Sequence, residues 1–417
     1  MMLPEGWSRS TLGEIAKIAS GGTPDRSKPE YWGGDVAWVT TGEIQFNTIV
    51  DTTEKITVAG LQNSSTKLFP PGTLLMAMYG QGKTRGQLAK LGIEATTNQN
   101  SAAILLNDGH EPDFYFHYLS SQYENIRDFG QAGGISHLNA GLLKQIPIPV
   151  APVTEQRRIA HILSTWDQAI ATTERLLANS RHQKMLLSQQ VLTGKARLAS
   201  FTASGHKRTT PYGSVPVEWD YPRIGDVAAE ISEKLGESEP HPVLSCTKHH
   251  GLVDSLKYFK KQVFSVNTST YKVAPRGCFV YATNHIDEGS IGYQNLYEAG
   301  LISPMYTVFK TSNRVVDAYL LALLKTEHYR QIFASAINAS VDRRGSLRWK
   351  DFQRIHIPLP PVEEQQAIAT MLSQAGREVE LIKNQLDLLR EEKSALMSQL
   401  LTGKRRVRLP ADEAETA

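Results

Sequence analysis

Cysteine, long apolar runs and an excess of either charge are all scarce in this sequence of 417 residues. The two cysteines, Cys246 and Cys278, form no Cys-x-x-Cys pair, which argues against a zinc site or a disulfide framework and favours a reducing cytoplasm. No apolar run reaches the roughly 18 residues that would span a membrane. The first residues, MMLPEGWSRS, lack the regions of a signal peptide. The formal net charge of +3 neither requires nor excludes a nucleic-acid partner.

Complete motifs for nucleotide or methyl-donor chemistry are also missing. The proline pairs in LFPPG (68–72) and LPPV (359–362) lack the preceding acid or amide and the following aromatic residue of an amino-methyltransferase loop. The stretch GQGKT (80–84) resembles the end of a phosphate-binding loop, but Ala77 stands where the first glycine is needed. We therefore expect neither methyl transfer nor nucleotide binding by this chain.

Nuclease and metal chemistry find little support either. The one Glu-x-Lys, Glu391 to Lys393, falls in a segment that we expect to be a long helix, where no metal cleft can form. His249 and His250 could bind a metal, but no clustered acid or cysteine accompanies them. A turn or a DNA-facing loop is the preferred interpretation of this histidine pair. We expect a chain with no catalytic activity, no metal and no cofactor of its own.

What the sequence does contain is an internal repeat. Residues 146–198 align without a gap with residues 355–407, at a constant offset of 209, and roughly two-fifths of the aligned residues are identical. PVTEQRRIAHIL (152–163) faces PVEEQQAIATML (361–372), and each copy ends in LTGK. Because twice the offset is almost the whole chain, we expect two tandem halves, each a body followed by a tail.

Each tail has the pattern of a long helix with a coiled-coil seam. Prolines precede the first turn and a glycine, Gly194 or Gly403, follows the last. Apolar residues alternate at steps of four and three, a heptad that favours the two tails packing on each other over a helix packed on its own body. The expected interface residues are Ile159, Leu163, Trp166, Ile170, Leu177, Leu187, Val191, Ile368, Leu372, Val379, Ile382, Leu386, Leu389, Leu396 and Leu400.

The bodies alternate β-rich runs, such as GTLLMAMYG (72–80), with helical ones, such as PDFYFHYLSSQYENIRDF (112–129), which predicts α/β or α+β domains. The expected organisation is a first body (1–150), a first long helix (151–196), a linker (197–212), a second body (213–359), a second long helix (360–404) and a disordered tail (405–417) that is basic and then acidic.

Taken together, these motifs resemble the specificity subunits of Type I restriction–modification systems. The resemblance is carried by LPEGW (3–7), by GGTPDRSKPEYWGGDVAWVTTGEI (21–44) and by the duplicated proline–Glu–Gln and LTGK motifs, and it covers essentially the full length. It implies that each body is a target recognition domain that reads one half of a bipartite, asymmetric DNA site. It further implies that the helices form an antiparallel coiled coil, related by a pseudo-two-fold axis, that sets the spacer.

The resemblance also implies partners. These would be double-stranded DNA, two adenine-methyltransferase subunits, and restriction–translocation subunits. S-adenosylmethionine, ATP and Mg²⁺ would then be bound by the partner subunits and not by this chain. A cytoplasmic location and no membrane contact follow from this interpretation. The alternatives are a stand-alone coiled-coil scaffold that binds no specific DNA, and a fused enzyme of the same class, which the missing catalytic motifs disfavour.

The candidate DNA contacts are donor-rich residues on glycine-rich or polar loops, because base edges and phosphates are bound by such side chains. Each residue could equally belong to an ordinary surface loop. In the first body they are Lys83, Thr84, Arg85, Gln87, Asn98, Gln99, Ser136 and His137. In the second body they are Lys248, His249, Asn284, His285, Arg343, Arg344, Arg348 and Lys350.

Overall fold

The computed structural model describes residues 3–80, 82–129, 137–201, 205–237, 239, 241–338 and 345–408. Unit 1 comprises residues 1–175 and 384–417, and unit 2 comprises residues 176–383. We call the part of unit 1 before its long helix body 1 (residues 3–152), and the part of unit 2 between its two helical segments body 2 (residues 205–361). Both bodies combine strands with short helices, which confirms the prediction of two tandem mixed α/β domains.

Body 1 is built on a five-stranded sheet in the order β2-β9-β6-β7-β4, joined by a three-stranded sheet, β5-β3-β8, and the pair β1-β10. Neighbours are antiparallel, apart from the parallel pairs β3-β8 and β4-β7. The strands are β1 (Ser8–Thr11), β2 (Ala16–Ser20), β3 (Trp32–Val39), β4 (Asn47–Ile49), β5 (Glu54–Ile56), β6 (Leu74–Ala77), β7 (Leu88–Leu91), β8 (Thr96–Thr97), β9 (Ser101–Leu106) and β10 (Pro147–Val150).

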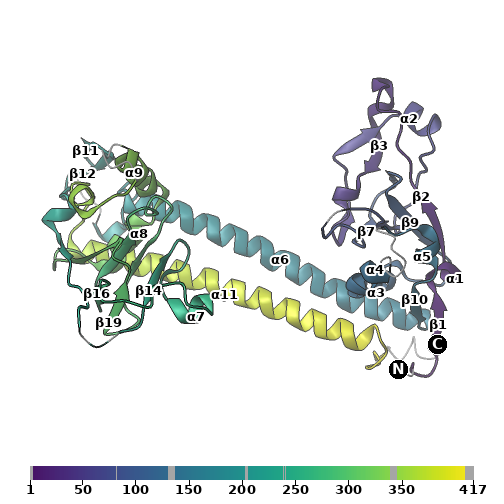
Figure 1. Ribbon diagram of the computed structural model, residues 1–417. Coiled ribbons are helices and arrows are strands. Elements are labelled where there is room, and N and C mark those ends of the chain that lie inside the picture. Colours follow the sequence, from purple (N-terminus) through teal and green to yellow (C-terminus); the bar gives the residue numbers. More distant parts are fainter. Residues whose placement is uncertain are drawn as a thin grey trace. The chain divides into compact units, whose positions relative to one another are not determined.

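Short helices complete body 1. They are α1 (Leu12–Ile15), α2 (Val58–Gln62), α3 (Pro112–Ser121), α4 (Tyr123–Phe129) and α5 (Ala140–Lys144). Proline at the first position of α3 suits a helix start, because its missing N–H would have no partner there. Phe114 and Leu119 of α3 are buried in one apolar core with Leu163 of the long helix. Figure 1 shows α3 beside that helix. Body 1 therefore shares its core with the helix that follows it.

Body 2 has a four-stranded antiparallel sheet in the order β13-β20-β17-β18, with the separate pairs β14-β15, β16-β19 and β11-β12. Its strands are β11 (Lys207–Thr210), β12 (Gly213–Pro216), β13 (Ala228–Ile231), β14 (Leu244–Thr247), β15 (Gly251–Asp254), β16 (Lys272–Pro275), β17 (Phe279–Ala282), β18 (Ile291–Tyr293), β19 (Ala299–Ile302) and β20 (Tyr306–Thr311). Its helices are α7 (Ser255–Phe259), α8 (Asp317–Leu324), α9 (Glu327–Asn338) and α10 (Trp349–Phe352).

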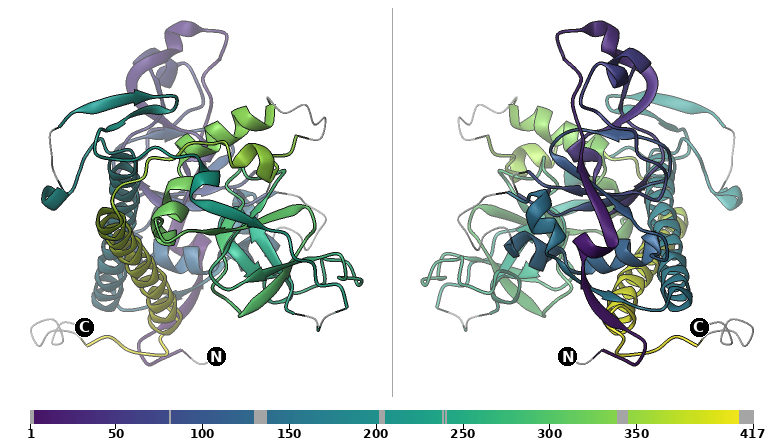
Figure 2. Two further views of the ribbon diagram at one scale, coloured as in Figure 1. Left: turned by 90° about the vertical axis from the view of Figure 1, so that its left-hand side faces the viewer. Right: turned by 90° about the vertical axis from the view of Figure 1, so that its right-hand side faces the viewer.

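Two segments differ from the sequence-based expectation. The expected linker (197–212) contains the strand β11, which pairs with β12 across a tight turn and forms a hairpin, seen as a separate pair of teal strands in the left view of Figure 2. The first residues of the expected disordered tail are ordered, because the Arg406 guanidinium binds the Glu155 carboxylate at 2.9 Å. Residues 409–417 lie outside the described residues. Polar composition alone suggested flexibility, whereas pairing and a buried partner order both segments.

The long helices are α6 (Val153–Leu192) and α11 (Val362–Leu400), each a few residues shorter at both ends than expected. Within unit 1 they run in opposite directions, since Asp167 pairs with Lys393, and Glu174 pairs with Arg390 at 2.6 Å. Within unit 2 the ion pair between Arg197, just after α6, and Glu364, in the first turn of α11, gives the same antiparallel order at 2.8 Å.

Every expected seam residue is buried or half-buried. In unit 2, Leu177, Val191, Ile368 and Ile382 are buried. Other apolar residues of the same helices are exposed: Leu176 at 50%, Met185 at 57%, Leu186 at 41%, Leu381 at 69% and Leu388 at 59%. The heptad thus separates the apolar positions that pack inward from those that face outward.

A tryptophan–glutamate–arginine cluster with a buried glutamate at its centre fastens each body to the helix ends. In unit 2, the indole nitrogen of Trp219 donates to Glu364 at 2.9 Å, and Arg197 donates to the same carboxylate. In unit 1, Trp7 donates to Glu155 at 3.3 Å, and Arg406 completes the cluster. In both clusters, the glutamate lies in the first turn of the long helix that follows the body. The arginine lies just after the end of the other long helix. The repeat at offset 209 therefore recurs in the side-chain contacts.

Candidate nucleic-acid interface

In body 1, three of the candidate segments meet beyond the end of strand β6. The backbone N–H of Met78 donates to the carbonyl of Asn100 at 2.9 Å, and the N–H of Leu138 donates to the carbonyl of Met78 at 3.0 Å. Next along the chain, the ring of Tyr79 stacks on His137 with centroids 4.8 Å apart and an interplanar angle of 11°. The structure thus brings together the loops 79–87 and 96–101 and the residue His137. Ser136 lies outside the described residues.

The loop 80–86 depends on its glycines and on helix α4 for its shape. Gly80, Gly82 and Gly86 have φ values of 141°, 66° and 84°, which favour glycine. Arg127 of α4 donates to the carbonyl of Gly82 at 2.8 Å, and the Tyr123 hydroxyl donates to the carbonyl of Lys83. Helix α4 therefore holds the loop through two of its backbone carbonyls.

The candidate side chains of this loop differ in exposure. Lys83 is exposed at the loop tip. Thr84, Arg85 and Gln87 are half-buried, and the Arg85 guanidinium donates to the carbonyl of Arg127 at 3.4 Å. Lys83 is the freest of the four to reach a phosphate or a base, while Arg85 also supports the loop.

The loop 96–101 supplies one structural residue and one accessible residue. The side-chain oxygen of Asn98 accepts hydrogen bonds from the Thr41 hydroxyl at 3.1 Å, from the N–H of Asn100 at 3.0 Å and from the Ser101 hydroxyl at 3.2 Å. That oxygen is committed to shaping the turn, so a bidentate contact of Asn98 with adenine would first break these bonds. Gln99 is exposed and accepts a hydrogen bond from the Thr23 hydroxyl at 2.5 Å.

In body 2, three candidate segments also meet beyond the end of strand β17, although the third of them, the turn between β14 and β15, comes from a different place in the fold. The N–H of Leu347 donates to the carbonyl of Thr283 at 2.8 Å, which joins the segment 345–350 to the loop 283–289. An atom added as Cβ on Gly289 would lie 3.8 Å from the carbonyl oxygen of Lys248, so the turn 247–251 adjoins the same loop. Three donor-rich segments therefore converge in body 2 as they do in body 1.

The candidate residues of body 2 are presented outward on these segments. Lys248 and His249 are exposed on the turn between β14 and β15, and Asn284 and His285 are exposed on the loop after β17. Arg348 and Lys350 are exposed at the start of α10. Arg343 and Arg344 lie outside the described residues.

Sequence reasoning missed the residues that hold the loops in place. In body 2, Arg330 of α9 donates to the carbonyl of Asp287 at 2.9 Å, as Arg127 of α4 does to Gly82 in body 1. Tyr123 adds a second contact in body 1. Each arginine lies in the second helix after the last strand of its sheet. The sequence signal for such a role is the four-residue spacing of Tyr123 and Arg127, which places both on one face of α4.

A buried histidine lies where body 1 meets the long helices. Burial lowers the pKa of His117 in α3 to about 4, and the charge of Lys393 acts in the same direction, whereas Asp167 opposes it. The Nε2 atom of His117 lies 3.7 Å from the Asp167 carboxylate. At neutral pH the ring is therefore uncharged and serves as packing.

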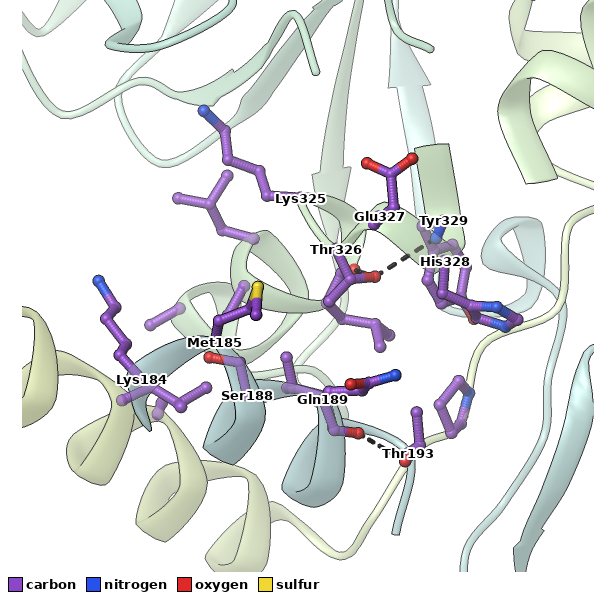
Figure 3. A pocket seen from close by; sticks show the side chains of 18 of the residues that line it. Lys184, Met185, Ser188, Gln189, Thr193, Lys325, Thr326, Glu327, His328 and Tyr329 are labelled. Atoms are coloured by element: carbon purple, nitrogen blue, oxygen red, sulfur yellow. Dashed lines mark hydrogen bonds between the residues drawn. The ribbon is translucent and has the colours of Figure 1, made fainter. Parts of the chain in front are cut away.

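Unit 2 contains a cavity of about 770 Å³ between the ends of its helical segments and body 2. Its walls are largely apolar, with Leu192, Val215 and Leu372 among them, and the side chains of Lys184 and Lys325 lie at its edge (Figure 3). Burial lowers the pKa of Lys325. Among the described residues that line the cavity, Glu327 is the one acidic residue, so no pair of carboxylates faces it.

The rest of the described chain gives no sign of a catalytic centre. Burial raises the pKa of Cys246 and Cys278 to about 12, so both remain thiols at neutral pH. In the ranges that the structure describes, no three histidine, cysteine or acidic residues gather as metal ligands. None of the described helices combines the length and apolarity that a bilayer crossing requires.

Comparison with known proteins agrees with this geometry. The family model of the Type I restriction modification DNA specificity domain matches residues 4–179 and again residues 216–391, so the chain belongs to this family and carries two copies of its domain. The MjaIX specificity subunit of Methanocaldococcus jannaschii is 22% identical over 97% of this chain and 95% of its own length.

Solved structures show the same fold. The crystal structure of a Type I specificity subunit from M. genitalium has a TM-score of 0.57 at 15% identity, covering 96% of this chain and 98% of its own. A chain from a type I restriction–modification assembly has a TM-score of 0.58 at 20% identity, covering 97% of this chain and all of its own. The family match, and not these structures, makes the chain a DNA-specificity subunit, the component of Type I restriction–modification systems that recognises DNA and performs no catalysis itself.

Proposed function

We propose that each body reads one half of a bipartite, asymmetric DNA target, with the converging segments beyond β6 and β17 as the reading surfaces. The observation that carries this proposal is the repeated convergence of three donor-rich segments at one strand end in each body. The two surfaces share their scaffold but differ in their side chains. Such a pair suits a target whose halves have different sequences, whereas identical surfaces would suit a palindrome.

The two long helices act as an antiparallel coiled coil that sets the distance between the half-sites, related by a pseudo-two-fold axis. This is supported by the oppositely directed ion pairs within each unit, by the buried heptad positions, and by the matching Trp–Glu–Arg clusters. A helix of 40 residues is about 60 Å long, so the rod can span several base pairs of spacer.

The same helices carry a docking surface for partner subunits. Exposed apolar side chains such as Leu186 and Leu381, both in unit 2, are costly to leave in water, and a subunit interface would bury them. The partners are two adenine-methyltransferase subunits and restriction–translocation subunits in the cytoplasm. S-adenosylmethionine, ATP and Mg²⁺ are bound by those partners.

Methylome sequencing of cells that express the methyltransferase subunits, with and without this chain, tests the proposal. We expect methylated adenines in an interrupted motif with two unlike halves, present only when this chain is expressed. A single uninterrupted motif, or methylation that does not depend on the chain, would contradict it. A stand-alone scaffold protein would give no motif at all.

A further inference from the structure

A carboxylate stands within the cationic reading surface of body 2. Glu288 lies on the loop 283–289 between β17 and β18, and its side chain is 51% exposed. The equivalent loop of body 1, GQGKTRG (80–86), contains lysine and arginine and no acidic residue. The two reading surfaces therefore differ in the sign of a charged group on matching loops.

The loop that carries Glu288 is held by backbone hydrogen bonds and a buried side chain. The N–H of Glu288 donates to the carbonyl of His285 at 3.2 Å, and Ile286 between them is fully buried as an anchor. Arg330 fixes the next carbonyl, that of Asp287, at 2.9 Å. Because the backbone is held on both sides, Glu288 has a defined position from which to act.

Two neighbours compensate the charge of Glu288 without covering it. The Nδ1 atom of His285 lies 3.2 Å from one carboxylate oxygen, and the Nζ atom of Lys248 lies 4.0 Å from the other. Each oxygen can accept further hydrogen bonds, since a carboxylate has about four acceptor positions. The Glu288 carboxylate is thus half-exposed, oriented by its two neighbours and able to accept further hydrogen bonds.

A carboxylate in this place repels the phosphates of DNA, so it weakens binding unless a donor meets it. The donors that DNA offers in the major groove are the exocyclic amino groups, N4 of cytosine and N6 of adenine. A carboxylate that accepts a hydrogen bond from such an amino group favours the base that carries the group. It disfavours the other bases, because they place a hydrogen-bond acceptor opposite the carboxylate.

We propose that Glu288 is a specificity-determining residue that accepts a hydrogen bond from a base amino group at one position of the second half-site. This inference rests on the proposed function of body 2. It assigns to Glu288 a role in base selection and not in phosphate binding. The first half-site, read by body 1, does not depend on it.

The experiment compares the purified complex with its methyltransferase subunits, as wild type, E288A and E288Q, on a DNA library with both half-sites randomised. The methylated molecules are sequenced. E298A is the matched control, because Glu298 is an exposed glutamate of the same body that pairs with Arg276 at 2.7 Å, away from the loop. We expect E288A to lose about tenfold or more of its selectivity at one position of the second half-site only.

The E288Q arm distinguishes the two bases. A glutamine pairs well with adenine, so this variant keeps the preference if the base is adenine and loses it if the base is cytosine. An unchanged second half-site in E288A would overturn the proposal, as would a uniform rise in methylation of all sequences, which is what loss of simple repulsion predicts. If the wild type itself shows no bipartite preference, the proposed function fails and not this assignment alone.

Discussion

The carboxylate of Glu364 is fully buried, and the guanidinium of Arg197 meets it at 2.8 Å from beyond the end of the other long helix. Because Trp219 also donates to this carboxylate, one residue in the first turn of α11 joins the start of body 2 to the segment after α6. The hydrogen bond with Glu364 raises the pKa of Arg197, so the guanidinium stays charged over the whole accessible pH range.

Arg197→Leu should destabilise unit 2 strongly, because it leaves the Glu364 carboxylate buried without its cation. Loss of one partner of a buried ion pair typically costs about 3–5 kcal/mol. Urea unfolding followed by tryptophan fluorescence would measure the change, since Trp219 lies in the cluster. Arg314→Ala removes an ion pair with Asp220 of the same length, 2.8 Å, between half-exposed side chains, and should cost less than about 1 kcal/mol. Equal costs for the two variants would contradict the role given to the cluster.

Arg330→Ala should relax recognition of the second half-site and leave the first unchanged, and Arg127→Ala should do the reverse. Each arginine supports one reading loop through a backbone carbonyl and is itself half-buried. We expect a loss of about tenfold in sequence selectivity at the affected half-site. Library methylation with sequencing would measure it, with Arg276→Ala as an exposed arginine control. Equal loss at both half-sites for either variant would show a general effect on folding.

Insertion of one heptad into each long helix should lengthen the preferred spacer. Seven residues placed after Ile170 and seven after Glu391 fall between the ion pairs Asp167–Lys393 and Glu174–Arg390, and they preserve the seam phase. They add about 10 Å of helix, which corresponds to roughly three base pairs. A library with variable spacers would report the new optimum. An active complex with the old spacer would refute the measuring role of the helices, and an insertion into α6 alone should abolish activity.

Unit 1 should lose stability in mild acid because of His117. Its pKa in the folded chain is about 4, below the ordinary value of 6.5, so the unfolded chain binds a proton more readily between these values. The stabilisation is therefore complete above about pH 6.5 and is lost as the pH falls towards 4. Thermal unfolding at several pH values would show it.

His117→Leu is the matching control for this acid sensitivity. Leucine already occupies the equivalent position in body 2. The Tyr115 hydroxyl donates to the carbonyl of Pro149 at 3.4 Å, and the Tyr319 hydroxyl donates to the carbonyl of Pro358 at 2.9 Å, so the two tyrosines are equivalent. Leu321, two residues after Tyr319, is therefore the counterpart of His117, two residues after Tyr115. The leucine variant should keep its stability at neutral pH and unfold with less dependence on pH between 6.5 and 4. An unchanged pH profile would mean that other groups cause the acid sensitivity.

The sequence by itself determined the duplication, the two long helices and the absence of complete catalytic motifs. Heptad spacing, prolines and glycines act locally, so they marked the buried positions of α6 and α11 and placed both helix ends within a few residues. Donor-rich loops can be recognised by composition, and so the segments around Lys83, His285 and Arg348 are predicted as DNA contacts without the fold.

Only the tertiary structure decided which of these residues work together. Hydrogen bonds across long sequence distances joined Met78 to Leu138 and Thr283 to Leu347, and no local pattern encodes such pairings. The same holds for Arg127, Arg330 and the Trp–Glu–Arg clusters, whose roles depend on a partner far along the chain. Asn98 shows the opposite case. Its residue type and its polar loop predicted a contact with DNA, but the structure shows that its side-chain oxygen is used for hydrogen bonds within the turn. Local sequence fixes backbone preference and periodicity, whereas burial and long-range contacts fix which polar group remains available.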